Sequence, residues 1–275
     1  YKNKFEDSLD VSDKPVQSVQ LYMPEYNDEV TSSFVVDSWY NKSIWLYLLY
    51  PFSLIFSFLT SRRRRRYIKN KIKSFTSKIP IIVIGNLTIG GTGKTPLVKY
   101  IATELIAKGY KPGIVSRGYG GQFKKTLKVT NETSVKETGD EAQILSKLGI
   151  PFYIDKNRVR AVKAIIKNND CDVILSDDGL QHYKMGRNIE IAVIDGKRRF
   201  GNNLTFPAGP LRESKDRLKT VDFIVNNSGP TDEGEYLMNI SPTKFVHLKS
   251  GKSYNIENWP MHKQVHAIAG LGNPG

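Results

Sequence analysis

Residues 81–95, IIVIGNLTIGGTGKT, constrain the fold of this chain more than any other segment. The apolar run at 81–84 predicts a buried parallel strand, and a glycine-rich turn leads from it to the letters G-K-T. Apolar residues then recur at helical spacing over 97–106, and Gly109 ends the predicted helix. The segment therefore predicts a strand, a tight turn and a helix in immediate succession.

Strand, glycine turn and helix in this order are the layout of a phosphate-binding loop. Glycines let main-chain N–H groups approach a polyphosphate, the lysine reaches the terminal phosphates, and the hydroxyl that follows holds Mg²⁺. The pattern usually has a glycine where this chain has Thr88, and an ordinary glycine turn is the alternative interpretation. The motif predicts a nucleoside triphosphate as ligand, bound by Thr88, Gly90, Gly91, Thr92, Gly93, Lys94 and Thr95.

Strand and helix patterns alternate after residue 110, and polar or charged groups follow the predicted strands. An open α/β sheet binds its ligands at the carboxyl ends of its strands. We expect a mostly parallel sheet with flanking helices, of the phosphate-binding-loop NTPase type.

Asp177 and Asp178 close the apolar run VILS. Adjacent carboxylates repel one another unless a cation is near, so the pair favours a magnesium site opposite Thr95. A turn or helix cap is the alternative, because Asp-Asp-Gly is also good turn chemistry. His182 follows about one helical turn later, and it either orients a carboxylate or substrate or is a hydrogen-bonded structural group.

Asp140 precedes a predicted helix at 141–148. It suits the N-cap position of that helix, and it also suits a general base that takes a proton from an attacking hydroxyl. A rigid Pro- and Gly-rich turn at 207–213 delivers a charged pair, Arg212 and Glu213. Arginines in or beside loops can clamp a phosphate or lie solvated on the surface: Arg117, Arg158, Arg160 and Arg212.

Residues 43–59 are apolar and uncharged, with Pro51 inside them, and a basic cluster from Arg62 to Lys78 follows without an acidic residue. Aromatic residues flank this stretch, as is typical of membrane contact: Trp39, Tyr40, Trp45 and Tyr67. A full span needs at least about 17 apolar residues, so the segment is at the lower limit. Shallow insertion, a span, and a buried helix followed by a solvated basic helix all remain open. In either membrane interpretation the basic cluster is cytoplasmic.

A formal net charge of +14 implies an anionic partner: a phosphorylated substrate, an anionic membrane or nucleic acid. We do not expect nucleic acid, because the basic residues gather beside an apolar segment without a stacking-aromatic motif. Cys171 is the only cysteine, so the chain suits a reducing cytosol. No protein partner is indicated.

The chain divides into four predicted regions. Residues 1–37 are an acidic extension, disordered or foreign to the rest; 38–78 are the membrane-associating helix and basic segment; 79–228 are the nucleotide-binding core; and 229–275 begin a C-terminal lobe. Both ends of the chain look like the edges of a fragment.

Seven segments together resemble the tetraacyldisaccharide 4'-kinase family, and the resemblance runs from about Ser38 to Gly275. Its residues are GNLTIGGTGKTP (85–96), SRGYGG (116–121), GDEA (139–142), SDDGLQH (176–182), VIDGKRRFGN (193–202), FPAGPLRES (206–214) and AGLGNP (269–274). The resemblance implies a kinase that uses Mg-ATP to phosphorylate the 4'-hydroxyl of a phosphoglycolipid, a tetraacyldisaccharide 1-phosphate. It also implies a place at the cytoplasmic face of the inner membrane, as a peripheral protein or with one N-terminal anchor.

Site roles follow from the same resemblance. It puts Lys94 and Thr95 on ATP and Mg²⁺, Asp140 as the catalytic base, and Asp177 and Asp178 on the metal side. His182 lies beside that pair, and three further residues are expected to handle phosphate or substrate: Arg160, Arg212 and Glu213. Residues 1–37 match nothing in the family, and the family continues beyond Gly275 with a piece expected to carry another active-site histidine. The alternative function is a membrane-associated ATPase that transfers no phosphate to lipid, although such proteins usually carry Lys where this chain has Ile89.

Overall fold

The computed structural model describes residues 30–41, 43–241, 244–246 and 250–255. Within these residues the core is an eight-stranded sheet with strand order β3-β4-β2-β5-β1-β6-β7-β8. The core strands run parallel, and short β3 is antiparallel to β4. The expected fold class, a mostly parallel sheet with flanking helices, is confirmed. The strands are β1 (Ile81–Gly85), β2 (Pro112–Ser116), β3 (Leu127–Lys128), β4 (Phe152–Ile154), β5 (Val173–Asp177), β6 (Ile189–Asp195), β7 (Phe223–Asn227) and β8 (Glu235–Met238).

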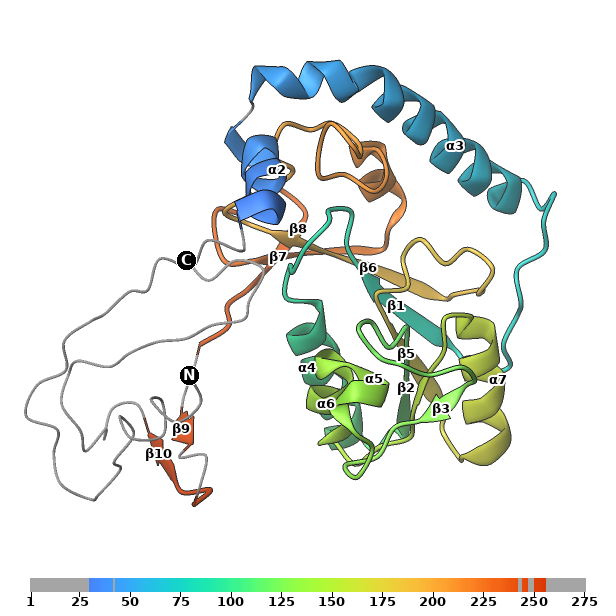
Figure 1. Cartoon of the computed structure of the whole chain (residues 1–275). Helices are drawn as coiled ribbons and strands as arrows, with labels where there is room; N and C mark the ends of the chain where they lie inside the picture. The colour runs from blue at the N-terminus through green and yellow to red at the C-terminus, as the bar shows by residue number, and fades with distance from the viewer. Residues whose placement is uncertain (1–29, 42, 242–243, 247–249, 256–275) are drawn as a thin grey trace, which may run out of the picture. The chain divides into compact units, whose positions relative to one another are not determined.

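Helices cover both faces of the sheet (Figure 1). On one face α7 (Arg158–Asn168) buries Ala161, Val162 and Ile165 against the strands. On the other face α4 (Lys94–Ala107) and α6 (Asp140–Ser146) pack into a second apolar cluster, and short α5 (Val135–Thr138) precedes α6. Both clusters are built from the alternating faces of the same strands, which is why the core strands are apolar throughout.

The centre of the sheet sets the place of the site. β1 lies between β5 and β6, and Ile84 near its end is paired with Asp177 at the end of β5. The loop that leaves β1 and the aspartate pair that leaves β5 therefore lie at the same edge of the sheet. This is the edge where parallel α/β sheets hold ligands.

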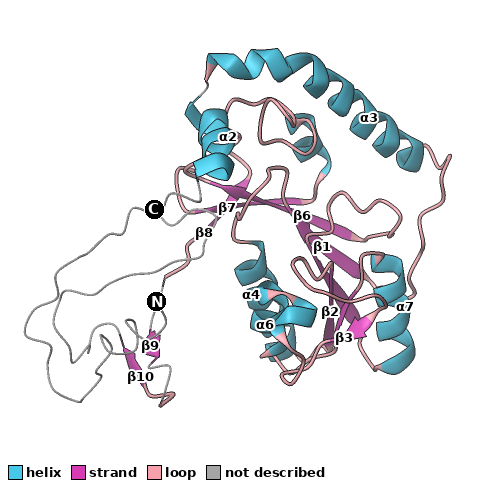
Figure 2. Cartoon of the chain, in the orientation of Figure 1, coloured by secondary structure: helices cyan, strands magenta, loops and turns pink. Residues whose placement is uncertain are grey.

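The N-terminal segment folds as helices over this edge. α2 (Val30–Asn41), the 3₁₀ helix η1 (Ile44–Leu49) and α3 (Tyr50–Ile68) follow in succession, and Figure 2 shows α3 extended over the loops between β6 and β7. Those loops include the 3₁₀ helix η2 (Lys215–Thr220). Pro51 occupies the first turn of α3, where its missing N–H has no cost, so it begins the helix and does not interrupt it.

Two regional boundaries differ from those drawn from the sequence. Residues 30–37, assigned to the acidic extension, belong to α2, whose residue Trp39 donates from Nε1 to the carbonyl of Pro207 at 3.0 Å. At the other end, β8 adds to the core sheet beyond residue 228. The described residues after Ile240 belong to a separate unit, in which β9 (Lys244–Val246) pairs antiparallel with β10 (Ser253–Asn255). The strand predicted at 267–269 and the motif at 269–274 lie outside the described residues.

Candidate active site

The glycine-rich loop between β1 and α4 has a fixed main chain. Gly93 is in the left-handed conformation (φ 86°, ψ 21°), and a Cβ there would lie 2.5 Å from Nδ2 of Asn227. That amide donates to the carbonyl of Thr92 at 3.3 Å, and Ile89 N donates to the carbonyl of Pro210 at 2.8 Å. Only glycine suits position 93. The first N–H groups of α4 follow directly, so the loop ends at a natural anion-binding position.

Lys94 projects from the first turn of α4 toward the aspartate pair. Its Nζ lies 3.8 Å from Oδ1 of Asp178, and the lysine is 8% exposed. Arg212 approaches the same carboxylate, with its NH1 3.0 Å from Oδ1 and 3.2 Å from Oδ2. Burial by itself would raise the pKa of Asp178, but Lys94, Arg212 and Arg158 together hold it below its usual value. Asp178 is thus an ionised carboxylate shared by several cations.

Arg158 is the third of these cations, and the sequence named it only as one of four arginines that could clamp a phosphate or lie solvated on the surface. It opens α7, is 4% exposed, and donates from NH2 to the carbonyl of Asp178 at 2.8 Å. Its Nε has no hydrogen-bond partner in the described structure. Burial lowers the pKa of Arg158 to about 10, so the side chain is still charged at neutral pH. A buried cation with an unused donor is well suited to bind an anion.

Arg160, which the sequence assigned to phosphate or substrate handling, has a different partner. It donates from Nε and NH2 to the two carboxylate oxygens of Asp155, at 2.9 and 2.8 Å. Asp155 is buried, whereas the Arg160 side chain is 57% exposed. In the described structure the guanidinium of Arg160 is therefore bonded to Asp155. Arg158, in the same helical turn, donates to the carbonyl of Asp178.

Asp177 is the buried member of the aspartate pair. It is 2% exposed, and its Oδ1 has no hydrogen-bond partner among the described residues. Burial raises the pKa of Asp177 to about 7, and Glu141 adds to the rise while Lys94 opposes it. A buried carboxylate oxygen without a donor is well suited to a cation.

The residues present therefore fit a magnesium ion. The described structure holds no cluster of three His, Cys, Asp or Glu side chains that could bind a metal unaided. Mg²⁺ does not need one, because it is commonly held by one or two carboxylates together with substrate phosphates and water. The hydroxyl of Thr95, the residue directly after Lys94, and the unpartnered Oδ1 of Asp177 have the required chemistry.

Asp140 is exposed at the first position of α6. Gly139 occupies the N-cap position with φ 82°, and no side chain caps this helix, so the capping interpretation of Asp140 is wrong. A Cβ on Gly139 would lie 2.0 Å from the carbonyl of Tyr119, so the 117–121 loop packs directly against the start of α6. The effect of Glu141 on the pKa of Asp177 places the start of α6 within electrostatic range of the aspartates.

Glu213 and His182 differ in their contacts. Glu213 is buried and accepts hydrogen bonds from the hydroxyl of Tyr183 at 2.6 Å and from Nε2 of Gln181 at 3.3 Å. His182 Nε2 is buried and has no hydrogen-bond partner in the described structure. Burial, followed by the positive charge of Arg158, lowers the pKa of His182 to about 4, so the imidazole is neutral at physiological pH.

A glycine-rich loop that ends in a lysine at the head of a helix, beside the acidic end of the neighbouring parallel strand, defines a phosphate-binding-loop nucleotide-binding protein. The comparisons with known proteins make the class specific. The family model described as tetraacyldisaccharide-1-P 4'-kinase matches residues 45–275. The chain belongs to the tetraacyldisaccharide 4'-kinase family, as its sequence motifs indicated, and it is an ATP-dependent kinase of lipid A biosynthesis.

Individual relatives agree with this assignment. The chain is 41% identical over 245 residues to the tetraacyldisaccharide 4'-kinase of Methylobacillus flagellatus, covering 88% of this chain and 73% of the relative. It is 41% identical over 237 residues to that of Shewanella denitrificans, covering 86% and 71%. A crystal structure of the Aquifex aeolicus enzyme in complex with ATP aligns with a TM-score of 0.64 and 28% identity, over 71% of this chain and 64% of that one. Family membership favours phosphotransfer over the alternative of an ATPase without a lipid acceptor.

Proposed function

We propose that this chain transfers the γ-phosphoryl group of ATP to the 4'-hydroxyl of a tetraacyldisaccharide 1-phosphate, with the chemistry at the edge formed by the ends of β1 and β5. The observation that carries the proposal is the 3.8 Å contact between Nζ of Lys94 and Oδ1 of Asp178 beside the glycine-rich loop. This contact joins the phosphate-binding and acidic parts of the site, which a phosphoryl-transfer enzyme needs within one triphosphate length of each other.

Asp140 is proposed as the base. It would accept the proton of the 4'-hydroxyl as the bond from that oxygen to the γ-phosphorus forms and the bond to the β-γ bridging oxygen breaks, releasing ADP. Its exposure at the start of α6 leaves its carboxylate accessible to a substrate hydroxyl. The charge of Glu141, the next residue in the chain, raises the pKa of Asp177. This supports a position for Asp140 close to the reacting phosphate.

The cations bind and orient the phosphates. Lys94 and the main-chain N–H groups of residues 90–95 would hold the β- and γ-phosphates and stabilise the charge that develops on them. Arg158 and Arg212 share the carboxylate of Asp178 with Lys94, so several positive charges surround a single ionised acid. The excess of positive charge in such a site favours the binding of a triphosphate.

Thr95 and Asp177 would hold a magnesium ion, with Asp178 beside them, and the ion would neutralise charge on the triphosphate. Glu213 is proposed as a positioning residue, because its buried carboxylate is fixed by Tyr183 and Gln181. Gln181 also donates to the carbonyl of Asn86 at 3.0 Å, at the start of the phosphate loop. His182, neutral and with a free Nε2, is a candidate to orient substrate or the aspartates.

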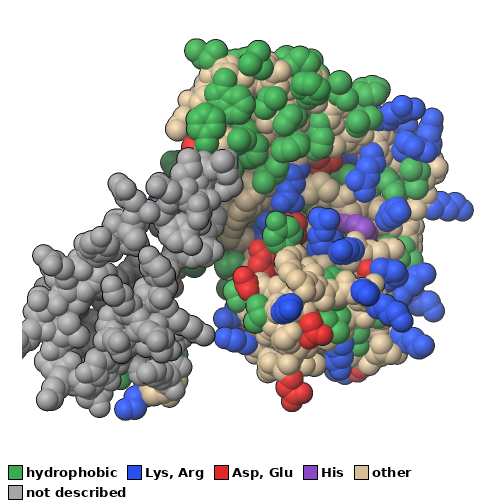
Figure 3. Space-filling model, in the orientation of Figure 1, with side chains coloured by type: hydrophobic (Ala, Val, Ile, Leu, Met, Phe, Trp, Pro, Cys, Tyr) green, Lys and Arg blue, Asp and Glu red, His purple; other side chains and the backbone are tan. Residues whose placement is uncertain are grey.

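The proposed membrane-binding segment consists of η1 and α3, which would lie on the cytoplasmic face of the inner membrane. Residues 44–68 form one helical stretch long and apolar enough to cross a bilayer, by length and composition alone. Figure 3 shows hydrophobic side chains gathered over this part of the molecule, with Lys and Arg beside them. In η1 and α3 the large apolar side chains that are more than half exposed are Ile44, Tyr47, Leu48, Phe52, Leu54, Ile55, Phe58, Leu59 and Ile68.

Contacts with the core favour shallow insertion over a span. The hydroxyl of Ser53, in the first turn of α3, donates to the carbonyl of Thr205 at 2.7 Å and accepts from the N–H of Ala208 at 2.9 Å. At the far end of α3, Tyr67 stacks on Tyr183 with ring centroids 6.0 Å apart. A helix that crossed the membrane would lose these contacts, whereas one lying in the interface keeps them.

A transfer assay tests the function. The chain is incubated with γ-labelled ATP, Mg²⁺ and purified tetraacyldisaccharide 1-phosphate in neutral detergent micelles. We expect label in the lipid, and an Asp140→Asn variant should lose turnover while its affinity for ATP changes little. Release of free phosphate without labelled lipid would contradict the proposed reaction, and loss of ATP affinity in Asp140→Asn with normal transfer would contradict the role of Asp140.

A further inference from the structure

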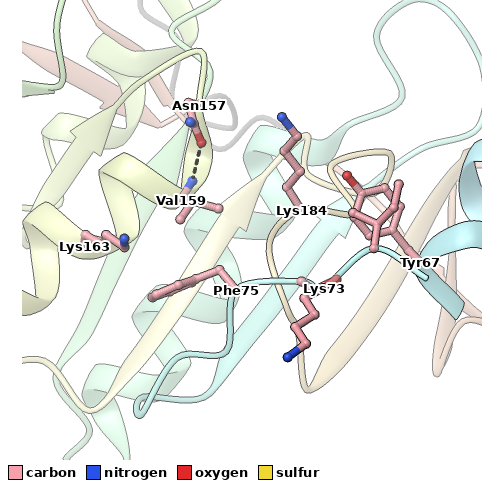
Figure 4. Close-up of a pocket in the computed structure, with 9 residues that line it drawn as sticks. Tyr67, Lys73, Phe75, Asn157, Val159, Lys163 and Lys184 are labelled. Atoms are coloured by element: carbon pink, nitrogen blue, oxygen red, sulfur yellow. Dashed lines mark hydrogen bonds between the residues drawn. The ribbon is translucent and has the colours of Figure 1, made fainter. Parts of the chain in front are cut away.

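Tyr183 lies between the end of α3 and the segments that surround the phosphate loop. Its side chain is buried, and its ring stacks on Tyr67, the buried tyrosine near the end of α3, with ring centroids 6.0 Å apart. Tyr67 lines an open pocket together with Lys184, the residue that follows Tyr183 (Figure 4). The stack therefore joins the proposed membrane-binding segment to the turn that follows β5.

The hydroxyl of Tyr183 begins a continuous line of hydrogen bonds toward the phosphate loop. It donates to Oε1 of Glu213 at 2.6 Å, and Oε2 of Glu213 accepts from Nε2 of Gln181 at 3.3 Å. The same amide of Gln181 donates to the carbonyl of Asn86 at 3.0 Å. Asn86, directly after β1, is fully buried and donates from Nδ2 to the carbonyl of Gly90 at 3.3 Å. The line therefore ends on the main chain of the glycine-rich turn.

The segment that carries Glu213 is also paired with the loop. Arg212 N donates to the carbonyl of Leu87 at 2.6 Å, and Ile89 N donates to the carbonyl of Pro210 at 2.8 Å. A displacement of Glu213 would therefore be transmitted to the loop through the main chain as well as through side chains.

A second contact from α3 reaches the same hydroxyl. NH2 of Arg64, in the arginine run of α3, donates to Oγ1 of Thr220 at 2.7 Å, and NH1 of Arg217 donates to the same oxygen at 2.7 Å. Arg217 is buried and donates from Nε to the hydroxyl of Tyr183 at 3.3 Å. Both contacts lie in the second half of α3, whereas Ser53 anchors its first turn, so the two ends of the helix can be altered separately.

The hydroxyl of Tyr183 is not needed for packing. The stack with Tyr67 uses only the ring, which phenylalanine would also supply. Burial, followed by the charge of Glu213, raises the pKa of Tyr183, so the hydroxyl keeps its proton and remains a donor. A buried hydroxyl and a buried carboxylate both cost free energy unless they are hydrogen-bonded, so their bond fixes the position of Glu213.

We infer that Tyr183 is a positioning residue for ATP binding, which holds the phosphate loop through Glu213 and Gln181 and is itself held by the second half of α3. A loop that is fixed before ATP arrives loses less entropy on binding, so the hydroxyl increases the affinity for ATP. Detachment of the end of α3 lowers that affinity. The inference rests on the proposed nucleotide site at this loop.

Four variants of the full chain test the inference. Tyr183→Phe removes the hydroxyl and keeps the ring, Tyr67→Ala removes the stack, and a third variant combines the two changes. Tyr153→Phe is the matched control, because it also removes the hydroxyl of a buried tyrosine, one that is bonded to Asn169 at the C-terminal end of α7. The dissociation constant for Mg-ATP is measured by calorimetry without a lipid acceptor, at a temperature below the melting transition of every variant.

Tyr183→Phe should bind ATP about fivefold or more weakly, because it removes a hydrogen bond to a buried carboxylate that supports the loop. Tyr153→Phe should bind ATP as the wild type does. The losses in Tyr183→Phe and Tyr67→Ala should combine to less than their product by at least about threefold, since both changes interrupt the same line of contacts. Normal ATP affinity in Tyr183→Phe, or a loss equal to that of Tyr153→Phe, would overturn the inference. Normal affinity in Tyr67→Ala, or fully multiplicative losses, would overturn the role of α3.

Lys94→Ala in the same binding assay tests the proposed nucleotide site itself. It should weaken ATP binding, because it removes a charge-assisted contact to the phosphates. Normal binding in Lys94→Ala would contradict the site and the inference together, whereas weak binding in Lys94→Ala with normal binding in Tyr183→Phe would contradict the inference alone. Because the acceptor is absent, a failure of phosphate transfer to lipid does not affect either outcome.

Discussion

Lys94 and Asp178 face each other across the phosphate loop, with Nζ 3.8 Å from Oδ1. The two residues come from different elements, the head of α4 and the turn after β5, and they meet because β1 and β5 are adjacent parallel strands. Asp178 has φ 50°, so its carboxylate is presented from a left-handed turn toward the loop. The pair keeps the lysine ordered before ATP binds, which reduces the entropy lost when the triphosphate arrives.

Lys94→Ala should reduce phosphate transfer by about 10²- to 10³-fold or more, because the ammonium group is expected to stabilise charge on the transferring phosphate. The measurement is kcat and KM with labelled ATP and the disaccharide acceptor. Lys99→Ala, an exposed lysine one turn further along α4, is the matched control and should retain normal activity. Near-normal transfer in Lys94→Ala would show that the loop lysine does not contact the reacting phosphates.

Arg158 and Arg160 should separate activity from stability. Arg158→Gln should lower kcat/KM by about 10-fold or more, because it removes a buried cation beside Asp178. Arg160→Gln should keep its kinetic constants and lower the melting temperature by a few degrees, because its guanidinium is paired with Asp155. The opposite result, with Arg160→Gln inactive and Arg158→Gln unaffected, would support the phosphate- or substrate-handling role predicted for Arg160 from the sequence.

The contribution of Asp155 to stability should depend on pH. Burial favours its neutral form, but Arg160, Thr126 and the N–H of Asn157 hold the pKa of Asp155 below its usual value of 3.8. An acid whose pKa is lowered by folding stabilises the native state above its unfolded pKa and loses that contribution as the pH falls. The melting temperature of Asp155→Asn should therefore lie below that of the wild type by a constant amount from about pH 5 to 8, and the gap should shrink below about pH 4. A gap that is unchanged at low pH would mean that the ionised carboxylate is not the stabilising form.

How much of the site the sequence predicts depends on whether its signal is local. The strand, loop and helix around Lys94 are encoded in consecutive residues, so their form follows from pattern alone. The burial of Arg158 could also have been predicted from the sequence. Arg158 shares the buried face of its helix with Ala161, Val162 and Ile165 at helical spacing, whereas Arg160 lies off that face. The choice between the two arginines was therefore a question of helix phase.

Contacts between distant segments were not predictable in this way. Because residues 1–37 are acidic, their sequence did not indicate the helix α2. Its residue Trp39 donates a hydrogen bond to the carbonyl of Pro207, which is far along the chain. The pairing of Phe75 with Met185, which joins the segment before β1 to the turn after β5, likewise has no local sequence signal. Strand order and loop pairing are set by tertiary packing, which a single sequence shows only through the lengths and polarity of its elements.

Asp177→Asn should raise the Mg²⁺ concentration needed for half-maximal activity and lower kcat at saturating Mg²⁺, because it removes the charge from the buried, unpaired carboxylate. Its melting temperature in chelator should equal or exceed that of the wild type, since burial disfavours the charged form of Asp177 and raises the pKa of its carboxyl to about 7. The two readouts distinguish a metal ligand from a structural acid. An unchanged Mg²⁺ requirement with a lower melting temperature would assign Asp177 to the structure of the turn.

Ser53→Ala should loosen α3 from the core and reveal how the helix seats the enzyme. The substitution leaves the N–H of Ala208 without its partner and removes one of the two donors to the buried carbonyl of Thr205, which keeps the N–H of Gly209, at a cost of about 1–3 kcal/mol. If α3 lies in the interface while it is held on the core, this change should raise the KM for the disaccharide in micelles and leave the KM for ATP unchanged, because only the lipid-facing part of the enzyme is displaced. Ser57→Ala, one turn further along the same helix, is the control and should behave as the wild type. A helix that spanned the bilayer would have no such contact to lose, so equal behaviour of the two variants in both lipid KM and melting temperature would favour a span.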